Sequence, residues 1–171
     1  MPQVRKRVIF IGTNQNQEII FPKKTVQKYL TVKEVLDSFP PLESGEESTI
    51  PNHIAMNHSD QMLEKMKYVK DGGSREEIPV NIRPKSGDIR KYIRCKSDEP
   101  SVCVTGDMRK IFHYEQNRAL TVRELAKLQS YPDDFVFMGS KISQQQQVGN
   151  SVPPKMAEAI AEVIIKMSEN V

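Results

Sequence analysis

Short apolar runs, separated by polar segments that contain proline or glycine, divide this chain. Residues 8–11 read Val-Ile-Phe-Ile and end at Gly12, a pattern that predicts a buried strand. Residues 13–24 are polar and include Pro22, so we expect a loop or a hairpin return there. A second short strand is predicted at residues 102–104, which read Val-Cys-Val.

Two segments carry the same helix-start signal. Residues 31–34 and 121–124 both place threonine three positions before glutamate, which is the capping-box pattern. The first predicts a helix from Val32 to about Asp37. The second predicts a helix that ends before Pro132 and turns one apolar face toward a core, namely Val122, Leu125, Ala126 and Leu128. Two helices with similar starts account for this likeness without an internal duplication.

Two further helices are predicted. Ser59 is placed to cap a helix that carries Leu63, Met66 and Val69 and ends at the glycine pair 72–73. The last helix begins at Pro153-Pro154 and has a broad apolar stripe formed by Met156, Ile160, Val163, Ile164 and Met167. Packing within this chain and packing on another domain explain the stripe equally well.

Composition indicates a modest core. The 171 residues suffice for one domain, or for a small domain with an appendage. Hydrophobic residues make up 37%, the mean hydropathy is −0.54 and there are 11 prolines, so we expect the chain to depend partly on a partner surface. Two cysteines without metal-like spacing favour a reducing compartment. We expect no membrane span and no signal peptide.

Charge adds a weak indication of a polyanionic partner. The formal net charge is +3, and eight basic residues lie between positions 83 and 110 against four acidic ones. A solvated surface would explain this cluster as well. At the start, Gln3, Arg5 and Arg7 fall on one face of the predicted strand because side chains alternate. Two guanidinium groups and an amide on one face suit a phosphate or the acceptor edge of a base.

Three motifs in a fixed order give the strongest signal. Residues 2–7 read Pro-Gln-Val-Arg-Lys-Arg, residues 118–124 read Arg-Ala-Leu-Thr-Val-Arg-Glu with Tyr-Pro-Asp at 131–133, and residues 149–154 read Gly-Asn-Ser-Val-Pro-Pro. This order resembles the DNA (cytosine-5) methyltransferases. The resemblance runs from Pro2 to Pro154 and is loose in the middle of the chain.

The resemblance implies a mixed α/β fold. It would be the C-terminal portion of a doubly wound, S-adenosylmethionine-dependent methyltransferase fold, together with a small irregular α/β target-recognition domain. We expect residues 1–24 to be the end of the catalytic-domain sheet and residues 25–135 to be the target-recognition domain. Residues 136–171 would form the cofactor-pocket turn and the final helix, which returns to the catalytic domain.

The resemblance also implies site residues. Arg7 matches the arginine that holds a flipped cytosine through its O2, Arg5 matches that arginine's companion, and Gln3 matches the amide of the same block. These three are the candidates for the catalytic centre. In the family, the turn at residues 149–152 completes the S-adenosylmethionine pocket, which implies cofactor contacts by Asn150, Ser151 and Val152. Most of that pocket would come from the N-terminal catalytic half of such an enzyme.

Candidate contacts to duplex DNA are Arg94, Thr105, Arg109 and Lys110, because they lie where the recognition region of the family ends. Cys103 is a departure, since threonine is usual at its position. The block at residues 118–132 is interpreted as structural rather than catalytic, with a capped helix followed by a proline stop.

Three features of the family's chemistry do not occur in this sequence. Neither Cys95 nor Cys103 follows a proline, as the family's nucleophile does, and there is no Glu-Asn-Val triplet and no Gly-x-Gly pair. We therefore expect a target-recognition part of a cytosine methyltransferase that is inactive without an N-terminal catalytic domain or subunit.

The alternatives are a natural subunit of a split enzyme, an excised part of one chain, and a catalytically dead remnant that binds DNA or a protein. A generic domain with an arginine-rich start is the least favoured. The expected setting is a restriction-modification system in the cytoplasm of a prokaryote, at the nucleoid. Self-association is expected through the uncovered stripe at Ile160, Val163, Ile164 and Met167.

Overall fold

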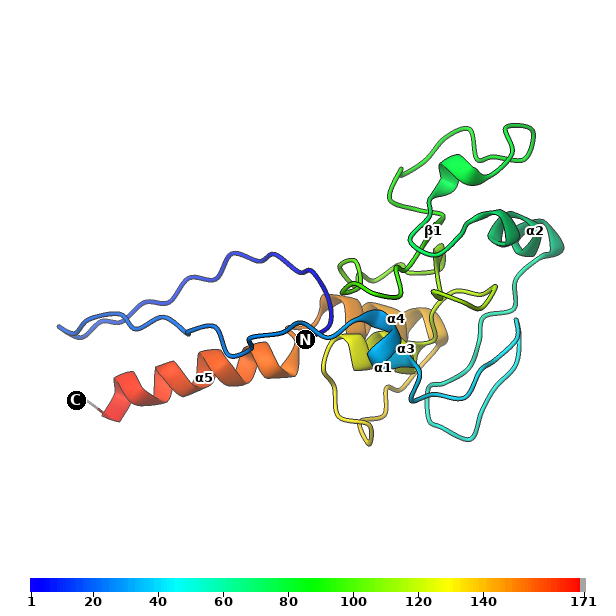
Figure 1. The fold of residues 1–171 in the computed structure, drawn as a ribbon. Coiled ribbons are helices and arrows are strands. Elements are labelled where there is room, and N and C mark those ends of the chain that lie inside the picture. Colours follow the sequence, from blue (N-terminus) through cyan, green and yellow to red (C-terminus); the bar gives the residue numbers. More distant parts are fainter. Residues whose placement is uncertain (170–171) are drawn as a thin grey trace.

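The computed structural model describes residues 1–169, which form a helical body, an upper lobe and a long arm (Figure 1). The elements in order are α1 (Val32–Leu36), α2 (Asp60–Tyr68), the 3-10 helix η1 (Arg75–Glu77), β1 (Ile93–Arg94), β2 (Ile111–Phe112), α3 (Val122–Leu128), α4 (Lys141–Asn150) and α5 (Pro154–Glu169). The fold is mixed and poor in strands. No helix within the described part is long and apolar enough to cross a membrane.

The body is built around α3. Its capping box is complete, because Glu124 N donates to Thr121 Oγ1 over 3.2 Å and Thr121 N donates to Glu124 Oε2 over 2.7 Å. The same capping box starts α1, as the sequence predicts. Leu125, Ala126 and Leu128 are fully buried and pack with α1 and with residues of the 104–114 segment.

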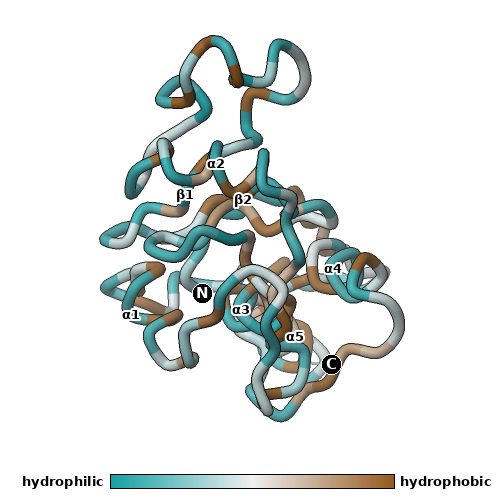
Figure 2. Tube along the Cα trace, turned by 90° about the vertical axis from the view of Figure 1, so that its right-hand side faces the viewer, coloured by the Kyte–Doolittle hydropathy of each residue, from teal (hydrophilic) through white to brown (hydrophobic). Residues whose placement is uncertain are grey.

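The upper lobe has its own small core. Met66 of α2 packs there with Val69, Ile78 and Phe112, and all four are at most 1% exposed. The only sheet described pairs β1 and β2 in parallel, with Ile93 opposite Ile111 and Arg94 opposite Phe112. Figure 2 shows apolar stretches both around β2 in the interior and in the loop at the top of this lobe.

The arm, residues 5–30, corrects the first strand prediction. Residues 8–11 form no strand, and Val8 and Phe10 are 80% and 92% exposed. Their backbone has no neighbouring strand to pair with in the described structure, so the β-prone run stays extended in solvent. The predicted strand at 102–104 is also absent; its neighbour Ser101 makes one isolated bridge to Gln3.

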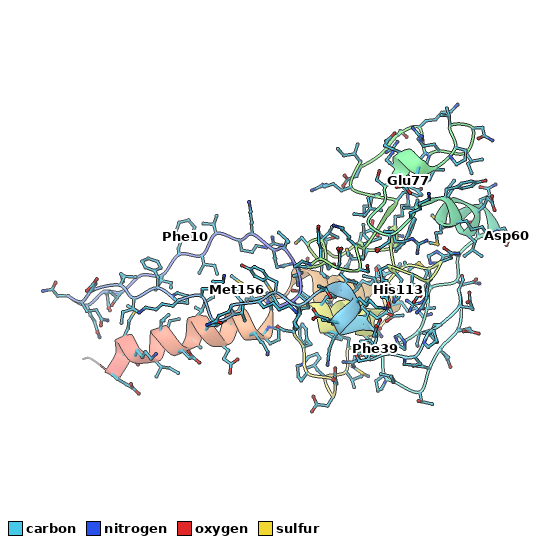
Figure 3. The ribbon with its side chains drawn as sticks, in the orientation of Figure 1. Phe10, Phe39, Asp60, Glu77, His113 and Met156 are labelled. Carbon is cyan, nitrogen blue, oxygen red and sulfur yellow. The ribbon has the colours of Figure 1, made fainter. Side chains whose placement is uncertain are left out.

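Helix α5 forms as predicted and lies beside the arm (Figure 3, where Phe10 and Met156 are labelled). The prediction that its whole stripe is uncovered is wrong for Val163 and Met167, which are 7% and 6% exposed. Ile164 and Ile165 remain more than half exposed. A cavity of about 690 Å³ separates arm and helix, lined by Ile9, Phe21, Met156 and Ile160 among others.

The polar helix α4 was not predicted, because its sequence Lys-Ile-Ser-Gln-Gln-Gln-Gln-Val-Gly-Asn has no apolar stripe. The structure supplies two reasons for it. Ser140 caps its start by accepting from Ser143 N over 3.3 Å, and Gln145, Val148 and Gly149 are buried against α3 and the loop beside it.

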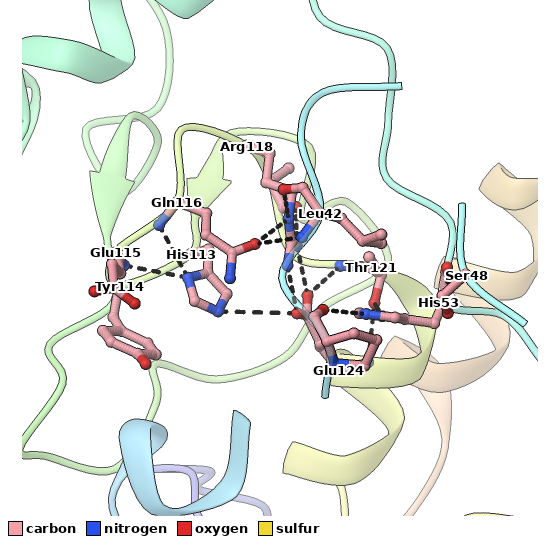
Figure 4. A network of polar contacts seen from close by, with 12 residues as sticks. Leu42, Ser48, His53, His113, Tyr114, Glu115, Gln116, Arg118, Thr121 and Glu124 are labelled. Atoms are coloured by element: carbon pink, nitrogen blue, oxygen red, sulfur yellow. Dashed lines mark hydrogen bonds and ion pairs between the residues drawn. The ribbon is translucent and has the colours of Figure 1, made fainter. Parts of the chain in front are cut away.

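A buried ion pair lies at the centre of the body (Figure 4). Arg118 Nη1 and Nη2 donate to Glu124 Oε2 and Oε1 over 2.8 and 2.7 Å, and both side chains are 1% exposed. Arg118 Nε donates to the Leu42 carbonyl and to Gln116 Oε1. Burial alone would raise the pKa of Glu124, but the hydrogen bonds and charge of Arg118 outweigh burial and lower it.

His113 completes this network in its neutral form. Its Nδ1 accepts from the backbone amides of Glu115 and Gln116, and its Nε2 lies 3.9 Å from Glu124 Oε1. Burial lowers the pKa of His113 to about 4, against the opposing influence of Glu124. Protonation of this ring would therefore disturb the centre of the body.

We expect Glu124→Gln to cost about 3–5 kcal/mol of unfolding free energy, because it leaves the Arg118 charge buried and unpaired. Urea denaturation measures this loss. The matched control is Asp133→Asn, which breaks the surface pair of Lys127 and Asp133 and should cost less than about 1 kcal/mol. Equal losses of unfolding free energy in the two variants would show that the buried pair contributes no more than the surface pair.

Stability should also fall with acid in the range set by His113. The unfolded imidazole takes up its proton near pH 6.5 and the folded one at about 4. Between these values the unfolded state binds more protons, so the unfolding free energy decreases as pH falls from 6.5 to 4. His113→Asn, which keeps an acceptor, should flatten part of this decrease in urea titrations at pH 7 and pH 4.5. An unchanged slope would exclude His113 as its source.

Candidate functional site

Three segments that are far apart in the sequence meet at the N-terminal end of the arm. Residues 2–4 pair with Ser101, since Val4 N donates to the Ser101 carbonyl over 2.8 Å and Ser101 N donates to the Pro2 carbonyl over 2.9 Å. The turn at residues 148–152 approaches from the end of α4. The structure therefore brings together the first motif, the end of the recognition region and the last motif.

Gln3 is buried at this junction with its amide fully engaged. Its Nε2 donates to the Leu128 carbonyl and to Gln129 Oε1 over 3.2 and 2.7 Å, and its Oε1 accepts from Val104 N over 3.1 Å. Gln3 is 6% exposed and also borders the cavity between the arm and α5. These hydrogen bonds favour a positioning role for Gln3, which the sequence places among the candidates for the catalytic centre.

Arg5 joins the two loops on either side of the junction. Its Nη1 donates to the Val104 carbonyl over 2.7 Å, and its Nη2 donates to the carbonyls of Gly149 and Ser151, both over 3.0 Å. Its buried Nε has no hydrogen-bond partner among the described residues. These contacts also make Arg5 a positioning residue rather than a substrate contact.

Arg7 is the exposed member of the first motif. Its Nη1 donates to the adjacent Lys6 carbonyl over 2.7 Å, and its Nη2 lies 3.9 Å from Cys103 Sγ. It also lines the cavity between the arm and α5. Of the two arginines Arg5 and Arg7, Arg7 is the more exposed and makes no side-chain hydrogen bond to a distant main-chain carbonyl.

A close backbone contact fixes the last motif against the recognition region. A side-chain Cβ at Gly149 would lie 2.2 Å from Gly106 N and from the Thr105 carbonyl carbon. Two backbones can approach this closely because glycine has no Cβ. Arg5 spans the same contact, so residues 104–106 and 149–151 are held as one unit.

The predicted cofactor contacts differ in availability. Ser151 is engaged, because its Oγ donates to the Val148 carbonyl over 2.8 Å and its own carbonyl accepts from Arg5. Asn150 is exposed and Val152 is 55% exposed. An amide beside an apolar side chain fits one wall of a site for a ligand with a polar amino-acid end. Within residues 1–169, no cluster of His, Cys, Asp or Glu is suited to a metal ion.

Arg94, a candidate DNA contact, is engaged within the protein. Its side chain is buried, and its three nitrogens donate to four carbonyls and one amide oxygen, over 2.6–2.8 Å. The acceptors belong to Met66, Val69, His113, Gln116 and Asn117. A guanidinium with this many acceptors holds the upper lobe to the body and is not free for DNA.

The other three candidates for DNA contact lie in the segment just before β2 and are exposed or half-buried. Thr105 is exposed. Arg109 Nε donates to Asp107 Oδ1 over 2.8 Å, and Lys110 Nζ lies 4.9 Å from the ring centre of Tyr92. Hydrogen bonds from Arg109, followed by those from Lys91, lower the pKa of Asp107, so this carboxylate stays charged beside the cations.

The two cysteines differ in their surroundings. Burial raises the pKa of Cys95 to about 12, so it remains a thiol in the core. Cys103 is half-buried, with its Sγ 3.6 Å from Arg5 Nη1. Sequence reasoning missed Gln129, which links Gln3 to the last motif by donating to the Val148 carbonyl over 2.8 Å. No sequence signal marks that link, because it joins residues 126 positions apart.

Comparison with known proteins agrees with the motif order. The family model described as C-5 cytosine-specific DNA methylase matches residues 1–166. The Type II methyltransferase M1.HphI of Haemophilus parahaemolyticus is 64% identical over 170 residues, which are 99% of this chain and 46% of that protein. M.BbvI of Brevibacillus brevis is 35% identical and covers 97% of this chain and 46% of its own length. The chain thus spans about half the length of these relatives.

Two other matches differ in extent. The Type II methyltransferase M.AquIB of Picosynechococcus is 36% identical over 127 residues, which are 67% of this chain and 87% of that relative. A crystal structure from E. coli, described as a DNA modification methyltransferase encoded within a prophage, has a TM-score of 0.63 at 20% identity. It covers 85% of this chain and 49% of that protein, which shows a likeness of fold.

The Gly149 contact predicts that an alanine substitution in α4 lowers the unfolding free energy, although alanine normally favours a helix. Gly149→Ala should favour α4 by about 1 kcal/mol from helix propensity alone. We expect a net loss of about 1–3 kcal/mol instead, because the new Cβ would collide with the backbone of residues 105–106. Gly12→Ala is the control, since a Cβ there meets nothing within 4 Å. Stabilisation by Gly149→Ala in urea unfolding would contradict the contact.

Proposed function

The chain belongs to the C-5 cytosine-specific DNA methylase family, and we propose that it supplies the target-recognition part of such an enzyme. The complete enzyme would transfer a methyl group from S-adenosylmethionine to C5 of a cytosine flipped out of duplex DNA. The observation that carries this proposal is the convergence of the first motif, the end of the recognition region and the last motif at one junction, with Arg7 exposed there.

In this proposal, Arg7 meets the flipped base. Its guanidinium would donate to the cytosine O2 and stabilise negative charge that develops on the pyrimidine during nucleophilic attack. Gln3 and Arg5 would not touch the base. They would hold the strand-like segment of Arg7 against residues 104 and 149–151 through the hydrogen bonds described above.

The turn after α4 would form one wall of the cofactor site. S-adenosylmethionine would supply the methyl group when bound. We propose that Asn150 and Val152 line its methionine end, while Ser151 keeps the turn in place through its bond to Val148. The rest of this site would come from residues outside this chain.

We propose that a polypeptide carrying the remaining half provides the nucleophilic cysteine and docks on the arm and α5. The exposed apolar side chains there offer it a surface; they include Val8, Phe10, Phe21, Ile164 and Ile165. The match to M.AquIB supports this arrangement, because it covers 87% of that methyltransferase's own length with only two thirds of this chain. The reaction would serve a restriction-modification system on nucleoid DNA in the prokaryotic cytoplasm.

The test is complementation of methyl transfer. The chain would be mixed with the part of M1.HphI that lies outside its match, and transfer of labelled methyl groups from S-adenosylmethionine into duplex DNA would be measured. We expect no transfer by the chain alone and clear transfer by the mixture. Arg7→Ala should lower the mixture's rate by about 100-fold or more. Lys67→Gln, at an exposed cation on α2, should leave the rate unchanged.

Three results would contradict the proposal in whole or in part. Robust transfer by the chain alone would show that it needs no second polypeptide. DNA binding without transfer in any mixture would favour the alternative of a catalytically dead binding module. A normal rate for Arg7→Ala would remove Arg7 from the catalytic centre.

A further inference from the structure

A short sequence repeat lies inside the proposed recognition region. Residues 87–94 read Gly-Asp-Ile-Arg-Lys-Tyr-Ile-Arg, and residues 106–113 read Gly-Asp-Met-Arg-Lys-Ile-Phe-His. Glycine, aspartate, arginine and lysine recur at the same four positions of the eight. The two copies run into β1 and β2, which pair in parallel with a register shifted by one residue from the repeat, since Ile93 lies opposite Ile111.

Both copies form the same clamp between aspartate and arginine. Asp88 Oδ1 accepts from Arg90 N and Arg90 Nε over 2.9 and 3.0 Å. Asp107 Oδ1 accepts from Arg109 N and Arg109 Nε over 3.4 and 2.8 Å. The carboxylate of Asp107 holds Arg109 through Nε alone and leaves both terminal nitrogens available. Asp88 also accepts from Arg90 Nη2 over 2.9 Å, so Arg90 keeps Nη1 and the second N–H of Nη2 for a ligand.

The lysines join the two copies into one unit. Lys91 Nζ donates to the carbonyl and to Oδ2 of Asp107 over 2.7 and 2.9 Å. Tyr92 N donates to the Lys110 carbonyl over 2.8 Å, and Lys110 Nζ lies over the Tyr92 ring. The two arginine clamps are therefore held side by side by contacts that cross between the copies.

The third position of the repeat differs in burial between the two copies. Met108 is 1% exposed and belongs to the core, whereas Ile89, its counterpart, is 78% exposed. The second clamp is thus anchored in the body, and the first projects with an uncovered apolar side chain into solvent.

Charge and geometry together indicate the ligand. The four cations at positions 90, 91, 109 and 110 exceed the two carboxylates at positions 88 and 107, so the unit is net positive. The side chains of Arg90 and Arg109 are 84% and 52% exposed. The terminal nitrogens of Arg109 make no hydrogen bond among the described residues. A guanidinium held through Nε presents two parallel donors at reduced entropic cost, which suits paired acceptors.

We propose that the two Asp-x-Arg-Lys turns form a two-pronged DNA-reading element, in which Arg90 and Arg109 each bind a pair of acceptor atoms on the duplex. The acceptors are guanine O6 and N7 or the oxygens of a phosphate, which share this chemistry. Lys91 and Asp107 position the prongs. This inference rests on the proposed function, since it assigns part of the recognition role to named residues.

The test uses the full chain and a fluorescent pool of duplexes with a randomised central segment. Affinity, its salt dependence and the sequences recovered from the bound fraction are measured for Arg90→Lys, Arg109→Lys and the double variant. We expect the double variant to bind at least ten-fold more weakly, although its charge is unchanged, because lysine cannot form the paired donors. Lys67→Gln is the control, being an exposed cation paired with Glu64 outside the repeat.

The two sources of acceptors give different patterns. If the prongs read guanine, the lysine variants recover altered sequences from the pool. If they bind phosphate, the recovered sequences stay the same, affinity falls uniformly, and Arg109→Gln lowers the slope of log affinity against log salt by about 1. Wild-type affinity, slope and sequences in the double lysine variant would overturn the inference while leaving the proposed function intact. Failure of the wild-type chain to bind duplex at all, with or without its partner, would instead contradict the proposed function.

The clamp has its own test. Asp88→Asn removes one negative charge but weakens the contact that holds Arg90. If the carboxylate orients the arginine, this variant binds DNA several-fold more weakly. Tighter binding would mean that Asp88 only offsets charge, which would overturn the role given to the clamp.

Discussion

The buried pair of Arg118 and Glu124 is the interaction on which the body depends. Two charges at 1% exposure are costly unless every polar atom has a partner, and here nearly every one does. Glu124 accepts from Arg118 and from the Thr121 amide, and its Oε1 lies 3.9 Å from His113 Nε2. Because Thr121 also starts α3, the ion pair and the capping box fix the same helix end.

Helix α3 connects this ion pair to the functional junction. The residues at its C-terminal end, Leu128 and Gln129, accept from Gln3, and Gln129 donates in turn to the Val148 carbonyl. Gln3 also holds Val104, and Arg5 extends the connection to residues 149–151. A chain of hydrogen bonds therefore runs from the buried ion pair to the segment that presents Arg7. A substitution at Glu124 would therefore affect the site through α3 rather than through direct contact.

Much of the helical structure was predictable, because its signals are local. The capping boxes of α1 and α3 and the apolar stripe of α5 depend on residues within one or two turns, and the structure confirms these helices. The strand at residues 8–11 failed for the opposite reason: a strand needs a neighbour, and none is present within residues 1–169. Helix α4 escaped notice because its buried face is made of Gln145, Val148 and Gly149, a pattern that does not stand out from its polar sequence.

The arginines show why the site itself was only partly predictable. Motif and spacing put Gln3, Arg5, Arg7, Arg94 and Arg109 among the candidates, yet their roles divide according to their acceptors. Arg5, Arg94 and Arg123 donate to several main-chain carbonyls from distant segments, which no local pattern reveals, and such guanidinium groups are structural. Arg90 and Arg109 are held by a carboxylate two residues away, which the repeated Asp-x-Arg-Lys sequence does reveal. A guanidinium bound through local contacts at one edge keeps its other edge for a ligand, whereas one surrounded by carbonyls has nothing left to offer. Counting acceptors therefore separates arginines that build this fold from those whose guanidinium remains available to a ligand.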